Sequence, residues 1–506
     1  MSFATAMHTE QADSRTENGA RSYSTPDESE MSGLIKLMFK GVRKLPVASL
    51  HAMLEESFAK TPAETIVLIF NLRHCRGGKG ERQLGREALS WLMCKHPILM
   101  PRLIKFIPEM GRWDDLIFLL TVTGTGKHKH KIEEIKDQIA MYYMLNLDSQ
   151  EQLMKEGKPT DLSAKWAPTE GDSMDKKHGV VARLCRVFGI HPKVYRTKYM
   201  TPLRAYSNIL EGLMCHGKWN EIEFKKVPSC AMKRLKKAFE KHLPEEFAKF
   251  KADLAAGKTT VKGKQLFPHE LVEQCRLGKY DAITQGQWDV VAEETRKLGN
   301  FARTTVVVDV SGSMSGTPMD VAFALGILIS EQTVEPFRGN VITFDNDPAF
   351  FTLKRGASLD EHCRMLRSAG WGMSTNIQST FELMLRAAQK AKLKAEDMPD
   401  RLIIVSDMQF NGCHGSNTTN WDEIKAKYKK AGYKRPTIVF WNVRGDIEDF
   451  PVTTVANDVC LVSGFSPSLL KGVIEMPKLT ISGFVTQVIT DPQYAELLQI
   501  AQELVA

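Results

Sequence analysis

The sequence predicts an α-helical repeat domain over residues 31–300, followed by an α/β doubly wound, Rossmann-like domain over residues 301–506. At 506 residues the chain is too long for one ordinary core. Before residue 300, apolar residues recur at helical spacing. After residue 303, short β-branched runs alternate with helical patterns, which is typical of a parallel sheet covered by helices.

The first thirty residues are polar, rich in Ser, Thr and Glu, and show no periodicity. They predict a disordered or loosely docked arm. No apolar run approaches the roughly 18 residues that span a bilayer, and the start lacks the features of a secretory signal. The nine cysteines never form C-x-x-C, which argues against a disulfide framework and a structural zinc. We therefore expect a cytoplasmic protein without a membrane partner.

The helical half is built from segments that often begin at a proline, as at Pro46, Pro62 and Pro97. Proline suits the first helical turn because the N–H groups there have no partner within the helix. Residues 148–179 are rich in Gly, Pro and acidic residues and predict a long loop. Helices resume at residue 180. Short polar links between such segments predict an antiparallel, HEAT-like stack of helix pairs.

In the second half, β-branched runs predict strands and apolar periodicity predicts the helices between them. The predicted strands are Thr304–Asp309, Val341–Phe344, Leu402–Ser406, Thr437–Trp441 and Val459–Val462, and the predicted helices are Pro318–Thr333, Leu359–Leu366, Ile377–Ala391, Trp421–Ala431 and Pro467–Val473.

The first of these strands ends in an acidic residue that two hydroxyls follow at alternate positions, Asp309, Ser311 and Ser313. Ligands of open α/β sheets bind outside the carboxyl ends of the strands. Three oxygens at that place suit a hard cation, Mg²⁺ or another divalent ion. Taken alone, the pattern also fits a turn rich in small residues.

The net charge of +8 is unevenly distributed, with −4 over residues 1–30, +15 over residues 31–300 and −3 over residues 301–506. A basic helical half suggests a polyanion such as RNA as its partner. The alternative is a set of solvated helix faces rich in lysine.

Two basic links between helices and one basic stretch are the candidate RNA-binding segments. Glycines expose the backbone of residues 73–82, but Lys79 is followed by Gly80, so this link is not a nucleotide-binding Walker loop. The candidate RNA-binding residues are Arg73, Arg76, Lys79, Arg82, Lys127, Lys129, Lys131, Lys226, Lys233, Arg234, Lys236 and Lys237.

Three segments of the second half, residues 309–313, 372–376 and 405–407, together resemble the metal-ion-dependent adhesion site of von Willebrand factor A domains. The resemblance implies that Ser311, Ser313 and Thr375 ligate a metal directly, and that Asp309 and Asp407 act through water. It also implies a partner that offers a carboxylate to the metal. Many members carry Gly where this chain has Met408.

The chain from about residue 35 onwards resembles the DUF2828 group of plant, fungal and viral proteins. The motifs that carry this resemblance are residues 76–82, 111–115, 165–168, 226–232, 371–372, 406–408 and 440–442. The group is similar in plan to the Ro autoantigen, with a TROVE-like helical ring followed by a von Willebrand factor A domain. Ro proteins bind single-stranded ends of misfolded small RNAs. The resemblance therefore implies an RNA partner.

Three functional hypotheses follow. The first is a non-enzymatic, RNA-binding ribonucleoprotein component that holds a second partner at its metal site. The second is a metal-dependent protein–protein interaction adaptor without RNA binding. The third, an enzyme, is disfavoured because no Ser/His/Asp or Cys/His set stands at an informative spacing, so no catalytic residue is predicted.

Overall fold

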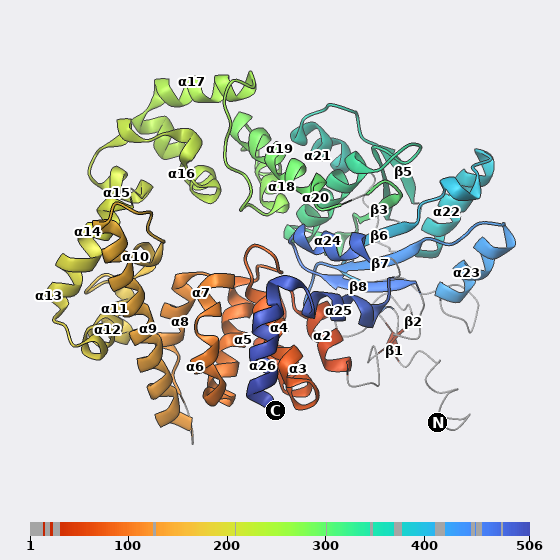
Figure 1. The fold of residues 1–506 in the computed structure, drawn as a ribbon. Coiled ribbons are helices and arrows are strands. Elements are labelled where there is room, and N and C mark those ends of the chain that lie inside the picture. The colour runs from red at the N-terminus through yellow and green to blue at the C-terminus, as the bar shows by residue number, and fades with distance from the viewer. Residues whose placement is uncertain are drawn as a thin grey trace. The chain divides into compact units, whose positions relative to one another are not determined.

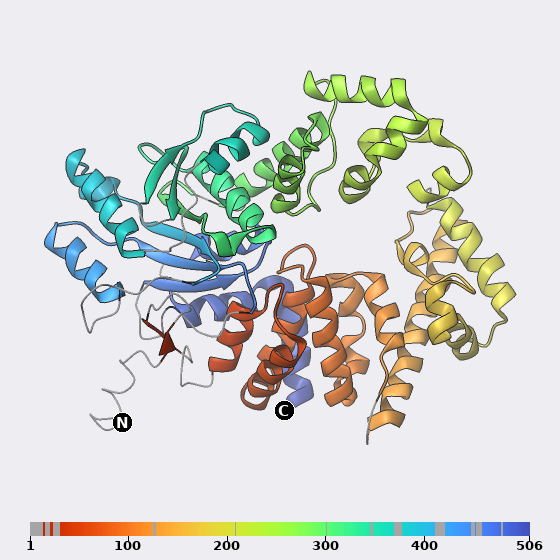
Figure 2. The ribbon, with the colours of Figure 1, turned by 180° about the vertical axis from the view of Figure 1, so that it is seen from behind.

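The computed structural model describes residues 14–15, 21–23, 31–124, 128–207, 209–299, 301–344, 348–368, 377–409, 420–446, 451, 458–476 and 479–506 (Figures 1 and 2). Most of residues 1–30, where we expected an arm, lies outside these ranges.

The chain folds into two compact units that interleave along the sequence. Unit 1 comprises Met1–Thr61, Pro228–Lys233 and Lys251–Asp491, and unit 2 comprises Pro62–Val227, Arg234–Phe250 and Pro492–Ala506. This arrangement differs from the sequential division expected at residue 300. The physical reason is packing. Helices near both ends of the chain bury their apolar faces against elements that are distant in sequence, as α2 (Ser32–Lys40) does on strand β8 (Val459–Ser463) and α26 (Ala495–Val505) does on α4 (Pro62–Arg73).

Unit 1 is built around a six-stranded sheet with the strand order β5-β4-β3-β6-β7-β8. All pairs are parallel except β4 and β5. The strands are β3 (Thr304–Asp309), β4 (Asn340–Phe344), β5 (Ala349–Thr352), β6 (Arg401–Ser406), β7 (Thr437–Asn442) and β8 (Val459–Ser463). The predicted α/β fold and its position after a helical region are confirmed. Of these six strands, the sequence analysis missed β5, a short antiparallel edge strand.

Helices on both sides of the sheet complete unit 1. Helix α20 (Thr317–Gln332) packs on β3, and its Gly326 allows the close approach, because a Cβ there would lie 2.6 Å from Cγ2 of Val308. Helices from before residue 300 take part, since α2 (Ser32–Lys40) packs on β8 and α18 (Pro268–Arg276) on α20. The other helices of eight or more residues in this unit are α3 (Val47–Lys60), α19 (Ala282–Arg296), α21 (Leu359–Ser368), α22 (Ile377–Lys390), α23 (Asn420–Lys430), α24 (Ser468–Glu475) and α25 (Ile481–Ile489).

The described part of unit 2 is helical. Its helices of eight or more residues, including the parts of α16 and α17 that fall in it, are α4 (Pro62–Arg73), α5 (Arg82–Lys95), α8 (Trp113–Thr121), α9 (Lys129–Lys155), α12 (Val180–Phe188), α16 (Ser229–His242), α17 (Pro244–Ala255) and α26 (Ala495–Val505).

Two features of unit 2 differ from the sequence analysis. The expected loop over residues 148–179 is partly helical, because α9 runs to Lys155 and short helices follow at Ser163–Trp166 (α10) and Ser173–His178 (α11). The C-terminal helix α26 lies along α4 (Figures 1 and 2), whose residues 65–73 are all buried. Helix α4 has apolar residues on all sides because it is covered from all sides.

Candidate metal site and candidate RNA-binding residues

The candidate metal site lies at the carboxyl edge of the sheet, where the strand order reverses. The chain leaves β3 toward β4 and β5 and later returns to β6 on the other side of β3. Asp309 ends β3 and Asp407 follows the last residue of β6, its parallel neighbour. Neighbouring strands that end at one edge place both carboxyl groups at this switch point, where open α/β sheets bind ligands.

Asp309 is fully buried and fixed by hydrogen bonds to both oxygens of its side chain. Its Oδ1 accepts a hydrogen bond of 2.9 Å from the backbone N–H of Ser311, and its Oδ2 accepts one of 2.6 Å from the hydroxyl of Ser406. Burial and the nearby Asp407 raise the pKa of Asp309 to about 6. A cation beside these carboxyl groups would offset this repulsion.

The two serine hydroxyls lie together, with Oγ of Ser311 and Oγ of Ser313 3.1 Å apart. Ser311 is buried and Ser313 is exposed, so the pair reaches from the interior to the surface. Asp407 is fully buried, and its Oδ1 has no hydrogen-bond partner among the described residues. A buried carboxylate oxygen without a partner is costly, and a cation or a water bound to it would satisfy it. The residues present therefore fit a divalent cation.

The sequence analysis missed Arg444, which follows β7 on the same edge. Its Nη1 donates a hydrogen bond of 3.2 Å to Oδ2 of Asp407. Asp446 holds the guanidinium at Nε and Nη2, at 2.9 and 2.7 Å. The only sequence signal was a cation two residues after the end of β7, a strand that neighbours β6. A fixed positive charge thus lies beside one of the predicted metal-binding carboxylates.

Two further predicted features of this edge have different outcomes. Thr375 lies outside the described residues, so its predicted role as a metal ligand stays a prediction. Met408, which stands where related sites often have Gly, is buried and has a φ of 65°. A side chain in this left-handed conformation is strained, which shows that the turn after Asp407 demands it.

The basic link of residues 73–82 does not present all its cations to solvent. Arg73 is 3% exposed, and its Nη2 lies 2.7 Å from Oδ2 of Asp115. Lys79 is 2% exposed, and burial lowers its pKa to about 7. The predictions of Arg73 and Lys79 as RNA-binding residues are therefore wrong, because neither group reaches a phosphate. Arg76 is exposed, and Arg82 is exposed but pairs with Asp114 at 2.5 Å.

Close packing, and not phosphate binding, explains the glycines of this link. A Cβ on Gly78 would lie 2.2 Å from the backbone oxygen of Asn71. The hydroxyl of buried Tyr494 lies 3.0 Å from both Nδ2 of Asn71 and Nδ1 of His74. The link therefore ties the segment before α26 to the end of α4.

The other candidate RNA-binding residues differ in exposure and pairing. Lys127 lies outside the described residues, Lys129 is exposed, and Lys131 pairs with Glu134. Lys226 pairs with Glu223, Lys236 is half-buried, and Lys233 pairs with Glu270 with only 19% of its side chain exposed. Arg234 and Lys237 are exposed, as is Lys241 one turn further on. These three form one stripe of α16, because residues spaced by three, four and seven share a helix face.

Comparison with known proteins gives the family. A family model described as "Domain of unknown function (DUF2828)" matches residues 16–138 and 121–303, and one described as "Domain of unknown function (DUF7788)" matches residues 304–490. An uncharacterized protein of Acanthamoeba polyphaga mimivirus is 33% identical over 487 residues, covering 91% of this chain and 84% of that protein. The chain belongs to the DUF2828 family.

The membership in DUF2828 that the sequence motifs indicated is thus confirmed. This DUF2828 protein is also similar to the crystal structure of Deinococcus radiodurans RO (RSR) protein, with a TM-score of 0.37 and 13% identity, over 91% of this chain and 99% of that one.

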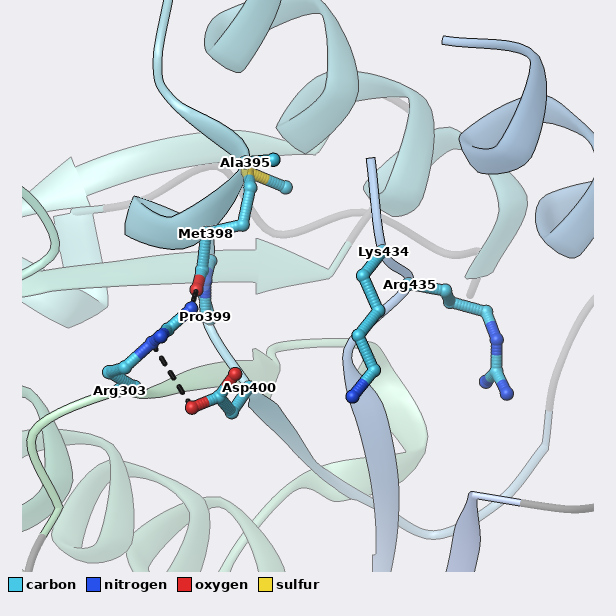
Figure 3. A pocket seen from close by; sticks show the side chains of 7 residues that line it. All are labelled: Arg303, Ala395, Met398, Pro399, Asp400, Lys434 and Arg435. Carbon is cyan, nitrogen blue, oxygen red and sulfur yellow. Dashed lines mark hydrogen bonds and ion pairs between the residues drawn. The ribbon is translucent and has the colours of Figure 1, made fainter. Parts of the chain in front are cut away.

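A small pocket of this DUF2828 protein lies at the amino-terminal edge of the sheet, opposite the candidate metal site (Figure 3). Its volume is about 40 Å³, which is room for a few water molecules and not for a base or a peptide side chain. Three residues that line the pocket are bonded to one another. Arg303 donates a hydrogen bond of 2.6 Å to the backbone oxygen of Met398 and forms an ion pair of 3.1 Å with Asp400. These bonds join the residues before β3 and β6, which gives the pocket a structural role.

Two kinds of feature are absent from the described part of this DUF2828 protein. No helix in it is long and apolar enough to cross a membrane. No group of three or more His, Cys, Asp or Glu side chains in it could hold a metal ion.

Proposed function

We propose that this protein is a non-catalytic binding protein whose α/β unit holds a divalent cation, Mg²⁺ by preference, at the carboxyl edge between β3 and β6. Through that ion it would take an acidic side chain of a protein partner. The observation that carries the proposal is Oδ1 of Asp407, a buried oxygen without a partner among the described residues. It lies on the same edge as Asp309 and the hydroxyls of Ser311 and Ser313.

The chemistry of these groups supports the proposal. The hydroxyls of Ser311 and Ser313 would ligate the ion directly, and Asp309 and Asp407 would hold its waters, with Thr375 as the expected third hydroxyl. Oxygen ligands of this kind suit Mg²⁺, which keeps part of its hydration shell. A bound divalent ion supplies an open coordination position for a carboxylate. No general base is proposed, because the carboxyl groups of the edge are engaged with the backbone, with Ser406 and with Arg444.

Calorimetric titration with MgCl₂ tests the site. Asp309→Asn and Asp407→Asn should each abolish the heat of binding, whereas Asp400→Asn at the opposite edge of the sheet should bind like wild type. Circular dichroism checks that each variant folds. Equal Mg²⁺ affinity in wild type and in both edge variants would overturn the proposal.

A second candidate function is binding of single-stranded or misfolded small RNA by the helical region. The exposed stripe of Arg234, Lys237 and Lys241 supports it, because Lys237 and Lys241 form no ion pair with any described residue. Arg234 pairs with Glu211 at 3.6 Å but keeps 68% of its side chain exposed. The net charge of +15 over residues 31–300 also supports it. Lysine and arginine that neutralise backbone phosphates release the counterions condensed on the RNA, so binding at such a stripe should weaken as the salt concentration rises.

Fluorescence anisotropy with a labelled single-stranded RNA at rising salt tests this second function. Reversing the charge of Arg234, Lys237 and Lys241 together should weaken binding to all sequences and reduce the salt dependence. Lys158→Glu, an exposed lysine outside the stripe, is the matched control. If wild type binds no RNA at low salt, or if the triple variant binds as well as wild type, the stripe has no such role.

A further inference from the structure

Two family motifs that are about fifty residues apart in the sequence meet in unit 2. Residues 111–115 contain Arg112 and Trp113 at the start of α8, and residues 165–168 begin with Lys165 and Trp166 at the end of α10. Helices α8, α9 and α10 pack on one another. The guanidinium carbon of Arg112 lies 5.8 Å from the ring centroid of Trp166. The fold therefore joins the two motifs through one cation–π contact.

A tyrosine of α9 extends this group of rings. The rings of Trp113 and Tyr142 are stacked, with centroids 6.1 Å apart and planes at 20°. Trp113 also packs edge-on against Tyr143, at 5.3 Å and 82°. Tyr143 is fully buried and donates a hydrogen bond of 2.8 Å to the backbone oxygen of Ser163, which begins α10. Buried Tyr143 thus attaches this group of rings to the interior of unit 2.

Its outer side is accessible. Arg112, Trp113, Tyr142 and Trp166 are all half-exposed. The buried anchor fixes the orientation of Trp113, so its ring would lose little conformational freedom when a ligand stacks on it. Rigid, partly exposed rings next to a cation are the usual platform for unpaired bases. We name the four residues the ring platform.

The charges around the ring platform decide between classes of ligand. Arg112 forms no ion pair with any described carboxylate, and Nζ of Lys165 lies 5.9 Å from the Trp166 centroid. Lys165 also pairs with Glu211 at 3.1 Å, so it is partly neutralised. Two cations beside Trp166 would repel a methylated lysine or another cationic ligand. They favour a planar ligand that carries negative charge nearby, which is a nucleotide.

The two ends of the ring platform differ in the charges beside them. Glu109 and Asp161 lie close enough to Tyr142 to add to the effect of burial in raising its pKa. The end at Tyr142 therefore borders acidic groups, and the end at Trp166 borders basic ones. A phosphate would be placed at Arg112, and the bases would lie along the rings toward Tyr142.

We propose that Arg112, Trp113, Tyr142 and Trp166 bind the unpaired bases of single-stranded RNA by stacking, with a backbone phosphate on Arg112. This inference rests on the proposed RNA binding and adds a base-contacting surface to the cationic stripe of α16. Stacking tolerates every base, so the platform distinguishes unpaired from paired RNA and not one sequence from another.

The test compares a short oligouridylate with an abasic ribose–phosphate oligomer of the same length. Both carry the phosphates, and only the first carries bases. Trp166→Ala should weaken binding of oligouridylate at least about fivefold and leave binding of the abasic oligomer unchanged. Trp166→Phe, which keeps a ring, should restore most of the affinity. Trp219→Ala is the matched control, because Trp219 is a half-exposed ring of the same unit that stacks on His242.

Tryptophan fluorescence gives a second readout that does not depend on affinity. Saturating oligouridylate should quench wild type more than Trp113→Phe or Trp166→Phe, and the abasic oligomer should quench none of them. If the Trp166→Ala and Trp219→Ala variants bind oligouridylate as wild type does, the ring platform is refuted while RNA binding stands. If wild type binds neither oligomer at low salt, the RNA function itself fails, and the platform with it.

Discussion

Nη1 of Arg444 donates a hydrogen bond of 3.2 Å to Oδ2 of Asp407, so a fixed guanidinium lies on the edge of the sheet where a divalent cation is proposed. Asp446 holds the guanidinium, and the loop that carries both is docked on the end of α2. Gly445 donates its backbone N–H to the backbone oxygen of Arg43 at 2.9 Å, and Nδ2 of Asn442 donates to that of Phe39 at 3.0 Å. The position of Arg444 is therefore fixed by the fold.

Because Arg444 is paired with Asp407, we predict that Arg444 weakens the binding of Mg²⁺ at this edge. Replacing Arg444 by Gln removes a positive charge next to Asp407 and should raise Mg²⁺ affinity roughly tenfold, because the like charges of the guanidinium and the ion repel each other, and about 1.4 kcal/mol corresponds to a factor of ten. Isothermal titration calorimetry measures the change. Arg303→Gln, an arginine at the opposite edge of the sheet, should leave the affinity as it is. Unchanged or weaker Mg²⁺ binding in Arg444→Gln would contradict the prediction.

Arg73, Asp115 and Arg82 belong to one network of ion pairs, but we expect their contributions to the free energy of unfolding to differ strongly, because Arg73 and Asp115 are buried and Arg82 is exposed. Asp115→Ala leaves the buried guanidinium of Arg73 without its carboxylate, and should lower the free energy of unfolding by roughly 3–5 kcal/mol. Arg82→Ala removes a side chain that is 55% exposed, and should cost about 0–1 kcal/mol. Urea unfolding followed by circular dichroism compares them. Similar losses in both variants would show that the network is not buried as described.

Tyr494 connects the C-terminal helix to the end of α4 through two buried hydrogen bonds. Tyr494→Phe leaves the side chains of Asn71 and His74 short of a partner, and should destabilise the protein by roughly 1–3 kcal/mol. Tyr206→Phe, which removes an exposed hydrogen bond to the backbone oxygen of Lys158 in the same unit, should have a much smaller effect. Equal unfolding midpoints for the two variants would argue against the connection.

Lys79 predicts a specific dependence of stability on pH. Burial lowers its pKa in the folded protein to about 7, whereas the unfolded chain keeps the ordinary value of 10.5. Between these values the unfolded state binds more protons, so the contribution of Lys79 to stability rises with pH from about 7 to 10.5. Below pH 7 the full cost of burying the ammonium is present.

Chemical unfolding of wild type and Lys79→Met at pH 7 and at a value near 9.5 measures this contribution. Other groups titrate equally in both proteins, so the difference isolates Lys79. The stability of wild type relative to the variant should rise by roughly 1.4 kcal/mol per pH unit at most within the window. A difference that stays constant with pH would mean that the ammonium is not desolvated.

Local sequence signals were sufficient for five of the six strands in the sheet of unit 1. The run Thr304–Asp309 was predicted with the bounds that the structure has, because a short β-branched run that ends at a carboxylate fits a buried strand better than a helix. Strand β5 was missed, since its residues Ala349–Thr352 are partly exposed and only four in number. A short edge strand carries too little apolar pattern to be distinguished from a loop.

At the candidate site, the sequence identified the residues that follow strands and missed the one that a loop brings in. Asp309 was found because ligands of open α/β sheets bind outside the carboxyl ends of the strands, and Asp407 was found through the resemblance to a metal-ion-dependent adhesion site. Arg444 lies two residues beyond its strand, and the pairing with Asp407 depends on the docking of its loop on α2. Nothing in the sequence around Arg444 encodes that docking.

The sequence by itself determined the order of a helical region and an α/β region, the parallel strands, and the acidic and hydroxyl residues at their ends, because these depend on apolar periodicity within short segments. Only the tertiary structure decided which charged groups are exposed. Arg73 and Lys79 look like surface cations in the sequence, yet α4, α5, α8 and α26 enclose that part of the chain. The physical reason is that the burial of a charge depends on partners distant in sequence, such as Asp115, which local patterns do not contain.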